Sequence, residues 1–424
     1  MLQAGSVQLL CLTATSGVPL FCRGRGSSKQ LPFSVIGSLN GVHMFGSSQD
    51  AQMCSTATEG GGTVVWRVFQ ESVALIAVSS EEGAGEPYLR RLLDNVFNCM
   101  VLVLGLDELS RVKNVERLKR DLRSCYRLID CFLESGGESI GDLTHCADCL
   151  VSPDSGVLQE CLDAFARAAE SEFGCLLADG RVVVATEKWW RLAPQEVVLL
   201  SFLVRSLAST SSRDCPIFLP QGSPNVPHRL LCFQLVPGVD VCVLCGPTPS
   251  LQSAESELVG RFWSPLVEPL RSCVGLKGRC FLGPAPRGIL GLLLINLDSS
   301  RALYSVQLSQ DTAAQDTLPP ERRRELLRLF YTLATTRYFQ GEPQGEKRET
   351  QMEDFPAGFS HEPLQCYLAA AECKCFALQT PQHQLFLLTA PTLPTFTLRS
   401  LATRTLSTHC CCTLEHGTLP RLLQ

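Results

Sequence analysis

The sequence contains little charge. Only 19% of its 424 residues are Asp, Glu, Lys or Arg, and the formal net charge is −5, whereas soluble domains usually carry roughly 25% charged residues. A slightly acidic chain lacks the basic surface on which general nucleic-acid binding depends, so we expect no nucleic acid among its partners. Because few charges are available to solvate so large a surface, we expect other proteins to cover part of it.

Long apolar runs are also missing. The longest, residues 99–106 and 289–297, are about half the roughly 20 residues that a membrane-spanning helix requires. The first residues show neither the basic stretch nor the cleavage site of a secretory signal. We therefore expect a protein of the reducing cytoplasm, whose 22 cysteines are free thiols that pack as small apolar side chains.

No catalytic signature occurs in the sequence. It contains no Gly-x-Ser-x-Gly elbow, no glycine-rich phosphate loop with its lysine, no dinucleotide-binding glycine pattern and no His-Glu-x-x-His. The motifs of common hydrolases, nucleotide-dependent enzymes and zinc proteases are therefore absent. We predict no catalytic residues and no cofactor.

Metal binding is the sharper alternative for some of the cysteines. Cys146 and Cys149 form a Cys-x-x-Cys pair beside His145, but a structural zinc site needs four ligands and usually two such pairs. No second pair lies near the first, and the cysteines of residues 373–375 and 409–412 form isolated clusters. We therefore interpret all of them as buried or incidental thiols and predict no metal site.

One succession of elements occurs three times along the chain. Two strand-like runs joined by a turn begin near Val7, Phe173 and Ile289, and each pair is followed by a helix that starts at a proline and then by two or three strands. The closing helices are clearest in the first unit, where residues 89–104 present a broad apolar face.

These repeats predict an α/β (α+β) fold of three domains. The linkers are glycine-rich segments, which place the domains at residues 1–135, 150–274 and 286–424. Residues 340–363 are polar, charged and rich in glycine and proline. We therefore expect a disordered insertion there, inside the third domain.

The helix predicted after Pro32 is poor in charge and rich in small residues. Core packing explains one face of such a helix, but polar residues do not cover the other face. This composition favours a protein–protein interface, although some of the residues belong to the core if the helix packs on a sheet. The interface candidates are Phe33, Ile36, Leu39, Asn40, His43, Met44 and Phe45.

A basic stripe is predicted if residues 112–132 form a helix, because several cations then fall close to one face. A solvated face opposite a core stripe is the simpler interpretation. The functional one is contact with an acidic partner or an anionic membrane surface, where each Lys or Arg contributes about 1 kcal/mol. The candidates for this contact are Lys113, Arg117, Arg120, Arg123 and Arg127.

Four segments give the chain a family resemblance. The longest is the run Leu-Pro-Phe-Ser-Val-Ile-Gly-Ser-Leu-Asn-Gly-Val-His-Met-Phe-Gly at residues 31–46, and the others lie at residues 114–119, 222–231 and 399–403. With these segments the chain resembles the Fuzzy family of planar cell polarity effectors, from Cys11 to about Leu406. The resemblance weakens at residues 340–363 and in the final cysteine-rich stretch.

The resemblance implies a fold and a set of partners. The fold is three longin-like domains, each a five-stranded antiparallel sheet with one helix on one face and two on the other. The implied partners are an Inturned-like longin protein, a WD-repeat planar polarity effector and a Rab-family small GTPase.

The function implied is that of a non-catalytic subunit of the ciliogenesis and planar polarity effector complex. Paired with the Inturned-like protein, it acts as a guanine nucleotide exchange factor in cilium assembly, planar cell polarity and Hedgehog-linked development. The implied location is the cytoplasm, the cytoskeleton and the cilium basal body. The alternative is a trafficking scaffold that binds GTPases without exchange activity.

Overall fold

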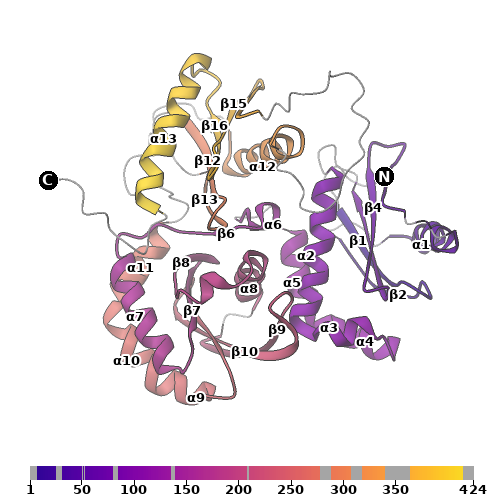
Figure 1. Ribbon diagram of the computed structural model, residues 1–424, viewed down its shortest axis with the longest axis horizontal. Coiled ribbons are helices and arrows are strands. Elements are labelled where there is room, and N and C mark those ends of the chain that lie inside the picture. Colours follow the sequence, from indigo (N-terminus) through magenta and orange to yellow (C-terminus); the bar gives the residue numbers. More distant parts are fainter. Residues whose placement is uncertain are drawn as a thin grey trace. The chain divides into compact units, whose positions relative to one another are not determined.

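The computed structural model divides the chain into two compact units, Met1–Lys277 and Gly278–Gln424, whose elements are labelled in Figure 1. It describes residues 7–24, 31–49, 51, 53–79, 85–134, 139–207, 210–276, 288–306, 318–339 and 363–413. None of the helices in these ranges has the length and hydropathy needed to cross a bilayer. Most of the predicted insertion at residues 340–363 lies outside the described residues.

The first sheet consists of five antiparallel strands in the order β2-β1-β5-β4-β3. The strands are β1 (Val7–Thr13), β2 (Pro19–Gly24), β3 (Ser55–Ala57), β4 (Thr63–Phe69) and β5 (Val73–Ser79). The β1–β2 hairpin turns at Gly17, whose φ of +63° disfavours any side chain. Alternate residues of each strand face opposite sides of the sheet, so both sides need cover.

Helices cover the two sides of this sheet (Figure 1). Helix α1 (Phe33–Ser48) lies over the side to which Leu10 and Leu12 point. Helix α2 (Glu86–Leu104) packs on the other side, against Leu9 and Cys11. Pro87 stands in the first turn of α2, where its missing N–H leaves no hydrogen bond unmade.

The segment after α2 is helical but not continuous. It contains α3 (Leu106–Ser110), α4 (Val115–Asp121), the 3₁₀ turn η1 (Leu122–Cys125) and α5 (Tyr126–Leu133). Helical backbone runs without a gap from Val115 to Leu133, so the helix assumed over residues 112–132 starts three residues later than expected and contains a 3₁₀ turn. It begins only at Val115, where the Asn114 side chain accepts a hydrogen bond from the Arg117 N–H at 3.0 Å, and it tightens where the Ser124 hydroxyl donates to the Asp121 carbonyl at 2.6 Å.

The second sheet repeats the design of the first, with strand order β8-β7-β11-β10-β9. Its strands are β7 (Phe173–Ala178), β8 (Arg181–Ala185), β9 (Ser212–Leu219), β10 (Ser223–Val236) and β11 (Val239–Cys245). The helical elements around it are α6 (Gly141–Thr144), α7 (Ser155–Ala168), η2 (Trp189–Arg191), α8 (Pro194–Ser206), α9 (Leu251–Ser253), η3 (Ala254–Val259), α10 (Gly260–Trp263), η4 (Ser264–Leu266) and α11 (Val267–Gly275), and a two-residue strand β6 (Ala147–Asp148) follows α6.

The first two sheets share one hydrophobic core. Residues of α2 and α5 belong to the same buried cluster as residues of α8 and β10. At its centre the rings of Phe132 and Phe202 stack with centroids 4.2 Å apart, and Gly105 at the end of α2 approaches the Phe218 ring so closely that a Cβ would lie 3.0 Å from it. Each of the two predicted domains thus has its own sheet, but the two sheets form one compact unit.

The second unit contributes five antiparallel strands in the order β14-β15-β16-β12-β13. These are β12 (Ile289–Asn296), β13 (Arg301–Ser305), β14 (Gln365–Ala369), β15 (Lys374–Gln379) and β16 (His383–Thr389). Helices α12 (Pro320–Arg337) and α13 (Leu398–Thr413), the latter after the turn η5 (Thr395–Thr397), lie on opposite sides of these strands (Figure 1). Three mostly antiparallel sheets flanked by helices confirm the predicted fold class.

Candidate protein-binding surface

One side of helix α1 holds it on the first sheet. Ile36 and Leu39 pack against the core residues of β1, β4 and β5, and the Trp66 indole N–H donates to the Leu39 carbonyl at 3.3 Å. These two interface candidates therefore position the helix. They are not part of its outward face.

Two polar candidates lie on the same inner side. The His43 Nε2 lies 3.2 Å from the Ala14 carbonyl oxygen, and the side chain is buried. Asn40 fills the space above Gly17, where a Cβ would lie 2.2 Å from its amide nitrogen. Both contacts reach the β1–β2 turn, so they fix where α1 sits along the sheet.

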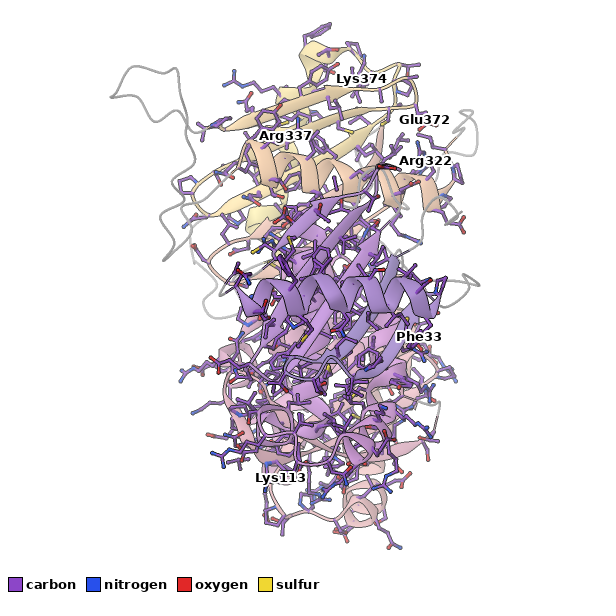
Figure 2. The ribbon with its side chains drawn as sticks, turned by 90° about the vertical axis from the view of Figure 1, so that its right-hand side faces the viewer. Phe33, Lys113, Arg322, Arg337, Glu372 and Lys374 are labelled. Atoms are coloured by element: carbon purple, nitrogen blue, oxygen red, sulfur yellow. The ribbon has the colours of Figure 1, made fainter. Side chains whose placement is uncertain are left out.

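The outward side of α1 is apolar, and no residue of the described ranges covers it. Phe33 is 84% exposed and Phe45 71% exposed, and Figure 2 shows Phe33 at one end of the helix as it runs across the strands. Val35 and Val42 are exposed between them. No Asp, Glu, Lys or Arg occurs between residues 33 and 48, so this face offers water almost no charge.

Small residues make the same side of α1 approachable. A Cβ placed on Gly37 or Gly41 would meet no atom within 4 Å, so neither glycine is required by packing inside the chain. Met44 is half-buried. A helix with exposed aromatic ends and a bare middle can accept a partner whose backbone comes close.

Sequence reasoning missed two residues of this surface, Val35 and Val42. The signal was present in the helical spacing. Ile36, Leu39, Asn40 and His43 stand at i, i+3, i+4 and i+7 and form the inner stripe. Val35 and Val42 each stand one position before a residue of this stripe and therefore lie at its border, whereas Phe45 lies on the opposite side.

Four of the basic candidates lie on α4, η1 and α5, whereas Lys113 lies in the bend before α4, and all five side chains are exposed. Two of them are partly neutralised. Arg117 lies 3.4 Å from Asp121 and 3.7 Å from Glu108, and Arg120 lies 3.5 Å from Asp121. The remaining three, Lys113, Arg123 and Arg127, have no ion pair with any described residue, and Figure 2 labels Lys113.

Burial keeps two cysteines of the first unit protonated. Burial raises the pKa of Cys125 and of Cys146 to about 12, so neither is a thiolate at neutral pH. Cys54 is exposed. Within the described ranges no three His, Cys, Asp or Glu side chains gather closely enough to hold a metal ion, and the side chains of residues 409–412 lie outside those ranges.

The Cys-x-x-Cys segment follows α6 in the chain and is largely buried. His145 closes α6 with a φ of +55°, and the Gln195 amide lies 3.2 Å from its Nδ1. Burial lowers the pKa of His145 to about 4, with a smaller effect from the nearby Arg91. The neutral imidazole is therefore a half-buried structural group.

Comparison with known protein families assigns a separate domain model to each of the three sheets. Residues 7–132, 169–264 and 288–409 match the models described as the First, Second and Third Longin domain of FUZ, MON1 and HPS1. Over 412 residues the chain is 58% identical to "Protein fuzzy homolog" of Xenopus tropicalis, which covers 96% of this chain and 98% of that protein.

Mammalian relatives carry the same description. The chain is 49% identical over 414 residues to "Protein fuzzy homolog" of Homo sapiens, with 95% of this chain and 97% of that protein covered. It is 50% identical over 410 residues to the protein of that name in Mus musculus, with 94% and 96% covered.

Proposed function

The chain belongs to the Fuzzy family of proteins with three longin domains, and from that membership we propose that it is a non-catalytic subunit of a membrane-trafficking assembly. In this proposal it pairs with an Inturned-like longin protein and joins a WD-repeat planar polarity effector. The pair acts as a guanine nucleotide exchange factor for a Rab-family GTPase. We further propose that it does so in the cytoplasm and cytoskeleton at the cilium basal body, in cilium assembly, planar cell polarity and Hedgehog-linked development.

The observation that carries the proposal is the outward side of α1. It is an apolar, charge-free surface with two exposed phenylalanine side chains, which is the chemistry of a protein-binding patch. An exchange factor needs such a surface more than it needs a nucleophile. It works by binding the nucleotide-free GTPase more tightly than the loaded form, which is catalysis by differential binding.

Nucleotide release tests the proposal directly. A Rab GTPase loaded with a fluorescent GDP analogue is mixed with excess GTP and with this chain, with the Inturned-like protein, or with both. We expect faster release only with both proteins present. Binding of the GTPase by the pair without faster release would contradict exchange activity and leave the scaffold function in its place.

Substitutions on α1 connect that activity to the surface. Phe33→Asp combined with Phe45→Asp should weaken partner binding at least tenfold, since exposed aromatic anchors commonly contribute 2 kcal/mol or more, that is ~30-fold. Val226→Asp is the matched control, because Val226 is an exposed apolar residue (58%) far along the chain on β10. Equal binding by both variants would remove α1 from the interface.

Three unpaired cations favour an additional contact with an acidic partner or anionic lipid. Lys113, Arg123 and Arg127 lie outside the ion pairs that neutralise Arg117 and Arg120. We propose that these three side chains make the contact, at about 1 kcal/mol for each one near an anionic membrane.

A further inference from the structure

Strand β14 is an edge strand that lacks the usual protection. Edge strands generally carry charges or prolines, or are very short, which prevents unwanted pairing. Strand β2 contains Pro19 and Arg23, β8 contains Arg181, β9 contains charged residues and Pro216, and β3 has three residues. Strand β14, Gln-Cys-Tyr-Leu-Ala, has five residues with no charge and no proline.

Along the outer edge of β14, one row of backbone groups has no partner among the described residues. In an antiparallel ladder, alternate residues direct both their N–H and C=O toward the same neighbour. The Leu364 carbonyl accepts from the Gln379 N–H, and the Ala370 N–H donates to the Cys373 carbonyl, so the even-numbered residues face β15. The amide groups of Gln365, Tyr367 and Ala369 therefore face away from the sheet.

Apolar side chains flank this edge on both faces. Tyr367 is 43% exposed, and Leu368, on the opposite face, is similarly exposed. Leu364 before the strand is 58% exposed. On the Tyr367 face, the Tyr367 hydroxyl lies 3.2 Å from the Thr395 hydroxyl, and Phe396 beside it is 85% exposed.

The charges near the end of β14 are already satisfied inside the second unit. Arg322 pairs with Glu325 at 2.7 Å and with Glu372 at 3.0 Å, and Figure 2 shows Arg322 and Glu372 side by side. Lys374 donates to the Leu393 carbonyl at 2.7 Å. Among the described residues, an approaching strand therefore meets an edge without an unpaired charge, and a charged strand would lose its hydration there without gaining a partner.

The size of the edge selects the kind of occupant. Five residues of strand extend about 17 Å, which accommodates one peptide segment. A stable dimer of folded chains buries roughly 1,200–2,000 Å², more than one short strand supplies. The edge thus fits an extended segment better than a second folded copy.

We propose that β14 is a docking site for an extended, uncharged apolar segment of a partner protein, which adds to the sheet as a further strand. The outward amide groups of Gln365, Tyr367 and Ala369 form the backbone hydrogen bonds, and Tyr367, Leu368 and Phe396 contact its side chains. This site lies in the second unit and is independent of the α1 surface.

Hydrogen exchange on the full-length chain tests whether the edge is open. In the free protein, the amides of Gln365, Tyr367 and Ala369 should exchange fast, while those of Cys366 and Leu368 are protected by β15. Protection of all five amides in the free chain would mean that the edge is already occupied, and would overturn the proposal. Protection that appears only as the chain concentration rises would assign the edge to a second copy and overturn it as well.

A synthetic peptide tests the occupant. The probe is an end-blocked nine-residue peptide of alternating valine and threonine, and its fully N-methylated counterpart is the control because it cannot donate backbone hydrogen bonds. Near saturation the probe should slow exchange of the three outward amides about tenfold, and the control should not. No change with the probe, or the same change with both peptides, would overturn the proposal.

Substitution of Tyr367 completes the test. Tyr367→Lys adds a charge at the edge while retaining the β14–β15 ladder, so peptide binding should fall at least tenfold and the protection of Cys366 and Leu368 should persist. Val226→Lys, an exposed apolar position on β10, serves as the matched control and should bind as the parent does. Undiminished binding by Tyr367→Lys would place the peptide elsewhere.

Discussion

Single residues decide which side of α1 is available to a partner. Ile36 and Leu39 looked like interface candidates because the sequence alone gives only their apolar character and helical spacing. Their packing against β1, β4 and β5 depends on where the helix lands on the sheet, and this is set by contacts far apart in sequence, such as Trp66 with the Leu39 carbonyl. Phe33 and Phe45 were candidates from the sequence because no charged residue accompanies them in the helix.

Two aspartate substitutions separate the two sides of α1. Leu39→Asp places a carboxylate against the core and should lower the free energy of unfolding by about 2–3 kcal/mol. Val42→Asp, on the outward side, should change it by no more than about 0.5 kcal/mol. Urea unfolding followed by circular dichroism measures both. A stable Leu39→Asp protein would show that this residue faces solvent.

His145 gives the protein a pH dependence of known sign. Its pKa is lowered to about 4 in the folded chain and is about 6.5 when unfolded, so between these values the unfolded state binds more protons and stability falls as pH falls. The full effect is about 3 kcal/mol below pH 4.

The measurement compares unfolding free energies of the parent and His145→Asn at several pH values from 7 to 4. Asn tolerates the left-handed backbone at this position, so the variant should fold. Asp148 is buried, and burial raises its pKa, so it has the opposite effect on stability as pH falls. That effect is the same in the parent and in His145→Asn, so the difference between their unfolding free energies reports on His145 alone. A pH-independent difference would contradict a half-buried neutral imidazole.

At the scale of elements, the sequence predicted the order of strands and helices but not where a helix changes its type. Alternating apolar runs and proline-started helices predicted three hairpin–helix–strand units. The apolar residues of the segment that became α4, η1 and α5 recur at spacings of three and four, which predict an α-helix throughout, and a single 3₁₀ turn still buries Leu122 and Cys125 at a spacing of three. The 3₁₀ turn at Ser124 depends on a hydroxyl-to-carbonyl hydrogen bond that residue spacing does not reveal.

Edge strands pose a related difficulty. The sequence Gln-Cys-Tyr-Leu-Ala predicts a strand at residues 365–369, but whether it is central or at an edge depends on the order β14-β15-β16-β12-β13. The missing charge in β14 becomes informative only once its position is known, because a central strand needs no protection.

At the scale of the whole molecule, the main finding beyond the sequence is that two longin domains share a core. The boundary predicted between residues 135 and 150 separates two sheets, yet Phe132 before it stacks on Phe202 after it. The composition of a linker indicates where one element ends. It does not indicate which apolar faces pack against each other in the folded chain.

The shared core predicts that the first two sheets unfold together. All four tryptophans lie in the first unit, with Trp66 on the first sheet and Trp263 on α10 beside the second. Variants that keep only one of these tryptophans should show the same urea midpoint by fluorescence. Phe132→Ala should lower the free energy of unfolding by about 3–5 kcal/mol. The urea midpoints seen by the two tryptophans should therefore fall by the same amount. Midpoints that differ between the two reporters would show that the sheets unfold separately.

The uncovered side of α1 also bears on how long the chain survives in a cell. Chaperones and proteases act continuously on the unfolded fraction of a protein, so a loss of about 1–2 kcal/mol of stability changes its abundance several-fold. If a partner protein covers this side of α1 as proposed, a chain made in excess of that partner keeps Phe33 and Phe45 in water and is the first to be removed. The supply of the partner would then limit the abundance of this chain.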